Sequence, residues 1–309
     1  MRNLNTNIRS FLKVLKQTFT NWADREPFNN SVIIAYYTIF SLPGLLVIVI
    51  NLASVLFEAE AVTHNISGQI GGLVGRDTAK DIEAMINQTN SQDGTTISTI
   101  LSIATLLFGA TGVFYQMQQV LNKMWDVKPK PKGKIWKLIK DRVFSFGLVL
   151  VVGFLLLVSL VISAGLSTVS DWLSARFSDT FAVVFHIVDV AISVGIITLL
   201  FASIFKFLPD ARIRWRDVWA GALLTSILFV LAKFALGFYF GNTNPESAYG
   251  AAGTIILIML WVSYAGLIVL FGAEFTQTYA NAHGRRVEPS SSAVSTEKTT
   301  AAPHLKGAG

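Results

Sequence analysis

Residues 209–240 read PDARIRWRDVWAGALLTSILFVLAKFALGFYF, a charged turn followed by a long apolar run. A second apolar run at 250–271 reads GAAGTIILIMLWVSYAGLIVLF, and the short polar connection 241–246 lies between the two. Each run has the ~20 residues that a helix needs to cross the hydrocarbon core of a bilayer. The arginines gather before the first run, and the connection contains none. This pattern predicts a transmembrane helical hairpin.

The composition extends this interpretation to the whole chain. Of 309 residues, 52% are hydrophobic and only 14% are charged, whereas soluble domains carry about 25% charged residues. The net charge of +6 is concentrated in loops beside apolar runs, so membrane topology explains it better than a nucleic-acid partner does. The chain has no cysteine, which excludes disulfides, thiolate metal ligands and cysteine nucleophiles.

Six apolar runs predict an all-α, polytopic membrane protein with six transmembrane helices and amphipathic interfacial helices. In lipid only helices and closed barrels satisfy their backbone, and runs this long without alternation are helices. Together the runs define a transmembrane domain at 32–280. The spans are expected at about 32–57, 96–116, 143–167, 182–207, 217–240 and 250–275.

The distribution of basic residues predicts the orientation. Of the 25 Lys and Arg residues, 21 flank one side of the predicted spans and 3 flank the other, and Lys233 lies inside a span. Cytoplasmic flanks carry the excess of Lys and Arg in membrane proteins. Both termini are therefore expected in the cytoplasm.

Residues 1–31 are predicted to form a cytoplasmic amphipathic helix rather than a span. Arg9, Lys13 and Lys16 lie on one face; the apolar residues of the other face are Ile8, Phe11, Leu12, Leu15, Phe19 and Trp22. Such a helix suits the membrane surface, and equally a position against the protein's own cytoplasmic side. Further interfacial helices are expected within 58–95 and 128–142. The Ser-, Thr- and Ala-rich segment 281–309 is expected to be a disordered cytoplasmic tail.

The first predicted span contains a proline–glycine pair, and the second carries a row of small residues on one face. Pro43 and Gly44 fall near the middle of the first span, where proline removes a backbone donor and predicts a kink or break. Broken helices line substrate sites in transporters, and a kink that serves only packing is the alternative. The second span carries small residues on one face, which lets another helix approach closely. They are Ser98, Ser102, Thr105, Gly109 and Gly112.

Ionisable residues inside spans are costly in hydrocarbon unless they meet a partner or a cavity. Asp189 and Lys233 each lie about seven residues from the outer end of a span, roughly 10 Å deep. Since their spans are expected to be antiparallel neighbours, the two side chains can meet. With His186 and Asn51 at similar depth, they are predicted to form an intramembrane polar cluster. The alternative is that Lys233 snorkels outward and His186 is interfacial.

Glu274 lies near the cytoplasmic end of the last span. The basic residues Arg212, Arg214 and Arg216 flank the same side of the membrane. We expect Glu274 to pair with one of them in a structural clamp between the last two spans.

The chain offers no catalytic or cofactor motif. It has neither a phosphate-cradling glycine loop followed by Lys-Ser/Thr nor a dinucleotide fingerprint. Its four histidines lie in separate regions without paired spacing, which argues against a histidine metal centre. We therefore expect that the protein is not an enzyme and that it binds no cofactor and no metal.

Seven short segments, each occurring once, follow one another along the chain in a specific order. They are AYYTIFSLP at 35–43, GATGVF at 109–114, LNKMW at 121–125, PD at 209–210, WRDVW at 215–219, YGAAG at 249–253 and FGAEF at 271–275. In this order they resemble the YihY/BrkB family of bacterial inner-membrane proteins, over about residues 22–280. The resemblance implies a virulence factor-like membrane protein, and some relatives are connected with export of lipid or lipopolysaccharide precursors. Others carry a ribonuclease name that looks like a historical misassignment, and the family offers no settled catalytic residues.

We therefore expect a multi-pass protein of the bacterial inner (plasma) membrane, a transporter or flippase-like protein for a lipid or envelope-related substrate. A non-transporting membrane scaffold for envelope integrity is the first alternative, and a ribonuclease is the disfavoured second. The expected partners are membrane lipids and the anionic inner leaflet. Homo-oligomerisation is left open, and no nucleic acid is expected.

Overall fold

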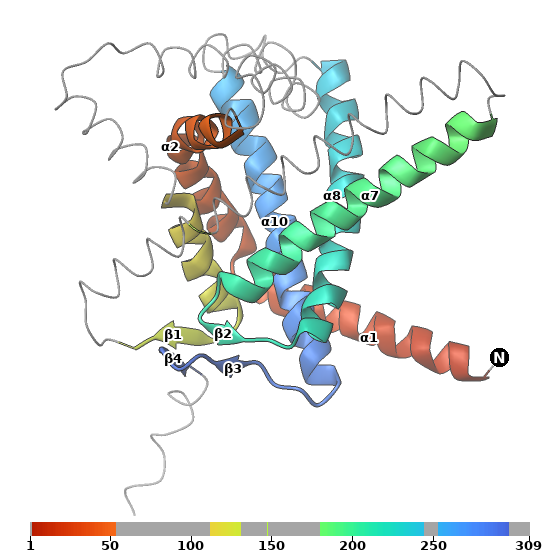
Figure 1. Ribbon diagram of the computed structural model, residues 1–309. Coiled ribbons are helices and arrows are strands. Elements are labelled where there is room, and N and C mark those ends of the chain that lie inside the picture. The colour runs from red at the N-terminus through yellow and green to blue at the C-terminus, as the bar shows by residue number, and fades with distance from the viewer. Residues whose placement is uncertain (1, 54–111, 131–146, 148–179, 244–252, 297–309) are drawn as a thin grey trace, which may run out of the picture.

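Helices dominate the described part of the chain. The computed structural model describes residues 2–53, 112–130, 147, 180–243 and 253–296. In chain order the elements are α1 (Arg2–Asp24), α2 (Pro27–Ala53), a helical stretch at 112–124, β1 (Val127–Pro129), α7 (Thr180–Phe207), β2 (Ala211–Arg212), α8 (Trp215–Thr243), α10 (Gly253–Ala282), β3 (Glu288–Pro289) and β4 (Ala293–Ser295) (Figure 1). The predicted helical class is confirmed, with short strands added to it.

Three helices of the described part are long and apolar enough to cross a membrane. The qualifying segments are Val190–Phe207 in α7, Trp215–Leu236 in α8 and Ile255–Ala282 in α10. They coincide with the last three predicted spans. The first predicted span falls largely in α2, whereas most of the second and nearly all of the third lie outside the described residues. The total of six spans therefore stays a prediction.

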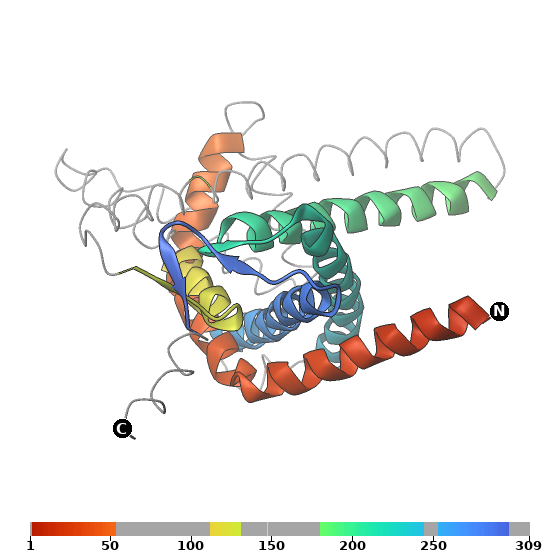
Figure 2. The same ribbon diagram turned by 90° about the horizontal axis from the view of Figure 1, so that it is seen from below.

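A sharp corner joins α1 to α2. α1 ends at Asp24, and Glu26 adopts a left-handed conformation with a φ of 54°. Pro27 opens α2, a position at which its missing N–H costs no helical hydrogen bond. The amide of Asn30 donates to the carbonyl of Arg25 at 2.8 Å and fixes the corner. As a result α1 lies across the end of the bundle (Figures 1 and 2).

α10 is the central helix of the described bundle. It packs against α2 and α8, and α7 packs against α8. α7 crosses α8 obliquely, so that the beginning of α7 leans away from it (Figures 1 and 2). We call the end of the bundle that carries α1, the turn 208–214 and the strands the basal end. The charge pattern predicts that this end faces the cytoplasm.

Two glycines let α8 and α10 approach each other closely. A Cβ added to Gly221 would lie 1.8 Å from Oγ1 of Thr276, and one added to Gly272 would lie 1.7 Å from Oγ1 of Thr225. Each threonine hydroxyl donates to the glycine carbonyl one turn back in its own helix, at 2.7 Å in α8 and 2.8 Å in α10. We call these four residues the glycine–threonine crossing. It brings two backbones together without leaving a hydroxyl unsatisfied.

Two short antiparallel strand pairs close the basal end. β1 pairs with β4 and β2 pairs with β3. This differs from the expected disordered tail over 281–309, because α10 continues to Ala282 and the following residues pair with distant strands. The segment is too polar to build a core of its own, but the backbone of 127–129 and 211–212 supplies its hydrogen-bond partners. Residues 297–309 lie outside the described residues.

Candidate functional site

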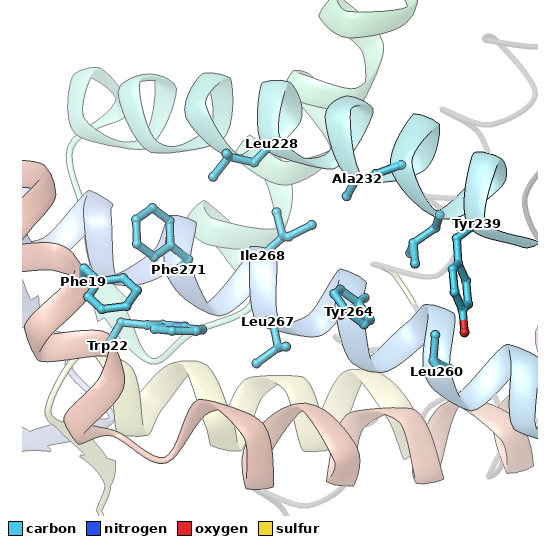
Figure 3. Close-up of a pocket in the computed structure, with 12 residues that line it drawn as sticks. Phe19, Trp22, Leu228, Ala232, Tyr239, Leu260, Tyr264, Leu267, Ile268 and Phe271 are labelled. Atoms are coloured by element: carbon cyan, nitrogen blue, oxygen red, sulfur yellow. The ribbon is translucent and has the colours of Figure 1, made fainter.

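An apolar groove runs along the bundle between α8 and α10, and α1 borders it at the basal end (Figure 3). It has a volume of about 740 Å³ and is partly open to its surroundings. We call it the lateral groove. Its lining side chains are aliphatic or aromatic: Phe19, Trp22, Leu228, Ala232, Ala235, Leu236, Tyr239, Leu260, Tyr264, Leu267, Ile268 and Phe271.

Small and aromatic side chains give the lateral groove its shape. On α8 the small side chains of Ala232 and Ala235 leave room opposite the larger side chains of α10. Trp22 lies at the basal end, where its ring meets that of Phe271 edge-on with centroids 5.9 Å apart. Tyr239 lies at the opposite end (Figure 3). The groove therefore ends in an aromatic side chain at each end.

The dimensions of the lateral groove suit a long, thin apolar ligand. At 1.5 Å per residue, its α8 wall from Leu228 to Tyr239 covers about 16 Å. This is roughly half of the ~30 Å hydrocarbon core of a bilayer. The lining residues carry no charge, and their only polar side-chain groups are the indole N–H of Trp22 and the hydroxyls of Tyr239 and Tyr264. Such a groove can bind an apolar chain through dispersion contacts, but it offers no group for bond-making chemistry.

A polar network centred on Arg25 lies at the basal end. The guanidinium binds both oxygens of the Asp126 carboxylate, at 3.1 and 2.7 Å. Its Nε lies 3.0 Å from Oε2 of Glu274, whose side chain is 1% exposed. A further donor reaches the carbonyl of Lys123 at 2.7 Å. Arg25 therefore joins the α1–α2 corner to the end of α10 and to the turn after residues 112–124.

Two further contacts tie residues 121–126, the end of this helical stretch and the turn after it, to the rest of the basal end. The indole N–H of Trp125 donates to the carbonyl of Ala273 at 3.1 Å, inside the buried core. The Asn122 amide donates to the Asp210 carboxylate at 3.0 Å and accepts the Asp210 backbone N–H at 2.8 Å. These contacts hold three segments that are distant in sequence in one fixed arrangement.

Glu274 has a different partner from the one that we predicted. Its carboxylate pairs with Arg25 of the α1–α2 corner, whereas Arg212, Arg214 and Arg216 are exposed. A second basal ion pair joins Asp217 of α8 to Arg285 after α10, at 3.2 Å. The predicted pairing was wrong because it rested only on the arginines flanking the same side of the membrane as Glu274. The sequence does not show which element packs against this part of α10, and in the structure it is the α1–α2 corner.

The predicted intramembrane cluster is described only in part. Lys233 is exposed on α8, as the snorkelling alternative requires. His186 and Asp189 lie in the first part of α7, and Asn51 lies near the end of α2; their side chains are outside the described structure. The beginning of α7 leans away from α8 (Figures 1 and 2). Because three of the four side chains are not described, the cluster stays a prediction.

The predicted helix break and small-residue face concern α2 and the helix at 112–124. α2 is continuous through Pro43 and Gly44, and it changes direction along its length (Figures 1 and 2). A functional role for this proline–glycine pair stays a prediction. Of the small-residue face, Gly112 lies in the described part, where an added Cβ would meet Ser41 and Tyr37 of α2 at 3.4 and 3.7 Å. The other four positions, Ser98, Ser102, Thr105 and Gly109, lie outside it.

Sequence reasoning missed both Arg25 and the glycine–threonine crossing. We counted Arg25 only as a topological charge, and no local pattern links it to partners more than 100 positions away. The crossing did have a signal, because a glycine precedes a threonine by four residues at 221–225 and again at 272–276. Small residues at that spacing in neighbouring spans are typical of close helix contacts.

Comparisons with known proteins agree with the membrane architecture. A family model described as "Virulence factor BrkB" matches residues 18–297. A "UPF0761 membrane protein" of Teredinibacter turnerae is 24% identical over 87% of this chain. A "Putative ribonuclease-like protein YfkH" of Bacillus subtilis is 24% identical over 85% of it.

The relatives differ in how much of their own length is matched. The chain covers 94% of the Bacillus protein but 60% of the Teredinibacter protein. A "UPF0761 membrane protein" of Verminephrobacter eiseniae is 28% identical over 57% of this chain, and 40% of that protein is covered. No solved structure matches the chain.

Proposed function

Because the chain belongs to the virulence factor BrkB family, we propose that this membrane protein is a transporter or flippase-like protein for a lipid or other envelope-related amphiphile. The lateral groove carries the proposal. It is apolar, partly open to its surroundings and about as long as one leaflet of the hydrocarbon core. An acyl chain can slide along such a path without leaving an apolar environment.

The test is lipid movement in liposomes that contain the purified protein. Vesicles with fluorescent lipids in both leaflets are treated with a membrane-impermeant quencher, and the lost fraction reports exchange between leaflets. We expect faster exchange than in protein-free vesicles for at least one class of lipid. Rates equal to those of empty vesicles across zwitterionic, anionic and glycolipid probes, with and without an ion gradient, would falsify the proposal.

Matched substitutions on α8 connect lipid movement to the lateral groove. Ala232→Phe places a ring in the groove, whereas Leu231→Phe changes the neighbouring residue, which is 60% exposed and outside the groove lining. We expect Ala232→Phe to slow exchange at least tenfold relative to the wild type, which corresponds to roughly 1.4 kcal/mol or more in barrier height. Leu231→Phe should leave the rate within about twofold. Equal rates for the two variants would mean that lipids take another path.

A membrane scaffold is the second candidate, and the basal end favours it. The Arg25 network, the glycine–threonine crossing and the strand pairs tie distant segments together in a way that suits a rigid support. A scaffold predicts no lipid exchange, combined with loss of envelope integrity when the gene is deleted. Full complementation of that loss by the Ala232→Phe variant would favour the scaffold over the transporter.

We do not propose a nuclease. The ribonuclease-like name belongs to the Bacillus relative. Within the described ranges, no group of three or more His, Asp or Glu side chains is placed to hold a metal ion. RNA cleavage by the purified protein, abolished by one point substitution, would reverse this judgement.

We also propose that the basal end faces the cytoplasm of a bacterial inner membrane. The absence of native cysteine makes this direct to test, because any thiol label reports only an introduced residue. Cysteine placed at the exposed position Lys128 should react with an impermeant maleimide only after the membrane is opened. Labelling of intact spheroplasts at this position would invert the proposed topology.

A further inference from the structure

One face of α8 carries an exposed stripe that changes in polarity along the helix. The stripe begins at Arg216 and continues through Trp219, Leu223 and Ile227 to Phe234, at helical spacings of three, four, four and seven residues. Trp219 is 44% exposed, Leu223 49%, Ile227 45% and Phe234 69%. We call these five residues the outer stripe. None of them belongs to the lining of the lateral groove.

Two arginines at the basal end of the outer stripe carry charge that the described structure does not neutralise. Arg212 lies opposite Glu288 across the β2–β3 pair, and Arg285 pairs with Asp217. Arg214 and Arg216 are exposed, and no ion pair is found for them within the described residues, so both are available to an external anion.

Neighbouring contacts hold this basic surface in place. Lys206 donates to the carbonyl of Ile213, and its Nζ lies 5.5 Å from the ring centroid of Trp215. The rings of Trp215 and Phe207 meet edge-on at 5.8 Å. The carbonyl of Arg214 accepts the backbone N–H groups of Asp217 and Val218 in the first turn of α8, at 3.0 and 3.1 Å. The two arginines therefore extend from a supported turn.

The order of chemistry along the outer stripe matches that of a phospholipid. Guanidinium groups suit the phosphate, because their planar N–H donors can bind two oxygens at once. Indole rings favour the interfacial region of a membrane, and Leu, Ile and Phe side chains favour the acyl chains. α8 qualifies as a membrane span from Trp215 onward, so Arg214 and Arg216 lie at its boundary.

We propose that the outer stripe, with Arg214, binds one anionic phospholipid of the adjacent leaflet. The two arginines hold its phosphate headgroup, Trp219 lies at the ester region, and Leu223, Ile227 and Phe234 contact an acyl chain. This binding does not depend on transport through the lateral groove. It assigns Arg214 and Arg216 a ligand in place of the pairing with Glu274 that the sequence predicted.

The experiment uses the whole protein in nanodiscs of phosphatidylcholine with a small proportion of phosphatidylglycerol. Native mass spectrometry counts the lipids that stay bound to the protein after it is released from the nanodisc. We expect the wild type to retain phosphatidylglycerol in excess, and the double variant Arg214→Gln/Arg216→Gln to bind it roughly thirtyfold more weakly. The matched control is Lys13→Gln/Lys16→Gln, which removes the same charge from exposed positions on α1.

Three outcomes overturn the proposal. They are no preference for phosphatidylglycerol in the wild type, an unchanged preference in the arginine double variant, and an equal loss in both double variants, which would show general attraction to an anionic surface. If the arginine variant does not fold, the proposal is tested by quenching of tryptophan fluorescence with brominated lipids, compared between the wild type and Trp219→Phe. Brominated phosphatidylglycerol should quench wild-type tryptophan fluorescence more than brominated phosphatidylcholine does, and this excess should fall in Trp219→Phe. Equal quenching by the two lipids contradicts the site.

Discussion

Replacing Gly272 by alanine tests the glycine–threonine crossing directly. The added methyl carbon would lie 1.7 Å from Oγ1, 2.9 Å from Cβ and 3.2 Å from Cγ2 of Thr225. Rotation of the threonine side chain can move Oγ1 and Cγ2, but it cannot move Cβ. The two helices must therefore separate by about half an ångström to restore ordinary contact, and such overpacking costs about 1–3 kcal/mol.

The assay is thermal unfolding of the purified protein in detergent, followed by tryptophan fluorescence and by the fraction that stays monodisperse. With roughly 2–4 °C per kcal/mol for a large domain, we expect Tm to fall by about 5 °C in Gly272→Ala. The control is Gly195→Ala on α7, where an added Cβ meets no atom within 4 Å. That variant should keep its Tm or gain slightly, since alanine favours helix over glycine by about 0.5–1 kcal/mol.

A compensating substitution separates a local clash from other effects. Thr225→Gly removes the three atoms nearest to the new methyl, so the double variant Gly272→Ala/Thr225→Gly should be more stable than the sum of the two single changes predicts. Coupling of about 1 kcal/mol or more is expected between residues in such contact. If Gly272→Ala melts like the wild type, or if the two changes are simply additive, the close approach of α8 and α10 is wrong.

Three other perturbations test the basal end. Arg25→Ala should lower stability by about 3 kcal/mol, because it leaves the carboxylate of Glu274 buried without its cation; adding Glu274→Gln should restore part of the lost Tm, and no restoration would refute the pairing. Trp125→Phe removes the indole N–H that the Ala273 carbonyl accepts and should cost about 1 kcal/mol in a melting experiment, whereas an unchanged Tm would show that the bond contributes nothing. Truncation after Ala282 removes β3 and β4 and should increase hydrogen exchange at 127–130, which comprises the partner strand β1 and Lys130, whose N–H donates to Ser292. Unaltered protection there would contradict the strand pairing.

Several features of the fold could be predicted because they depend on local chemistry. The last three predicted spans reappear in α7, α8 and α10, since a long apolar run in lipid has to satisfy its own backbone as a helix. The amphipathic α1 was also expected. The structure supports its position against the protein, because Phe11 meets Phe275 and Trp22 meets Phe271, although Phe19 stays 60% exposed.

The candidate site was harder to predict, because its contacts join residues that are far apart. Glu274 was recognised as a clamp, but its partner Arg25 came from the opposite end of the chain. The lateral groove leaves no trace in the sequence, since its leucines, alanines and aromatic residues look like those of any span. Which sides of α8 and α10 face each other decides where the groove opens.

The sequence alone determined the helical membrane class of the protein and its last three candidate spans, because hydropathy is summed over neighbouring residues. The six-span total and the orientation stay predictions from hydropathy and charge. Only the tertiary structure decided that Arg25 lies between Asp126 and Glu274, and that 288–289 and 293–295 form strands instead of a disordered tail. Both arrangements depend on which surfaces of distant segments pack together. For α8 and α10, the glycine–threonine crossing largely determines which helix faces are in contact. A small side chain permits a close approach, but only the assembled bundle specifies which helix makes it.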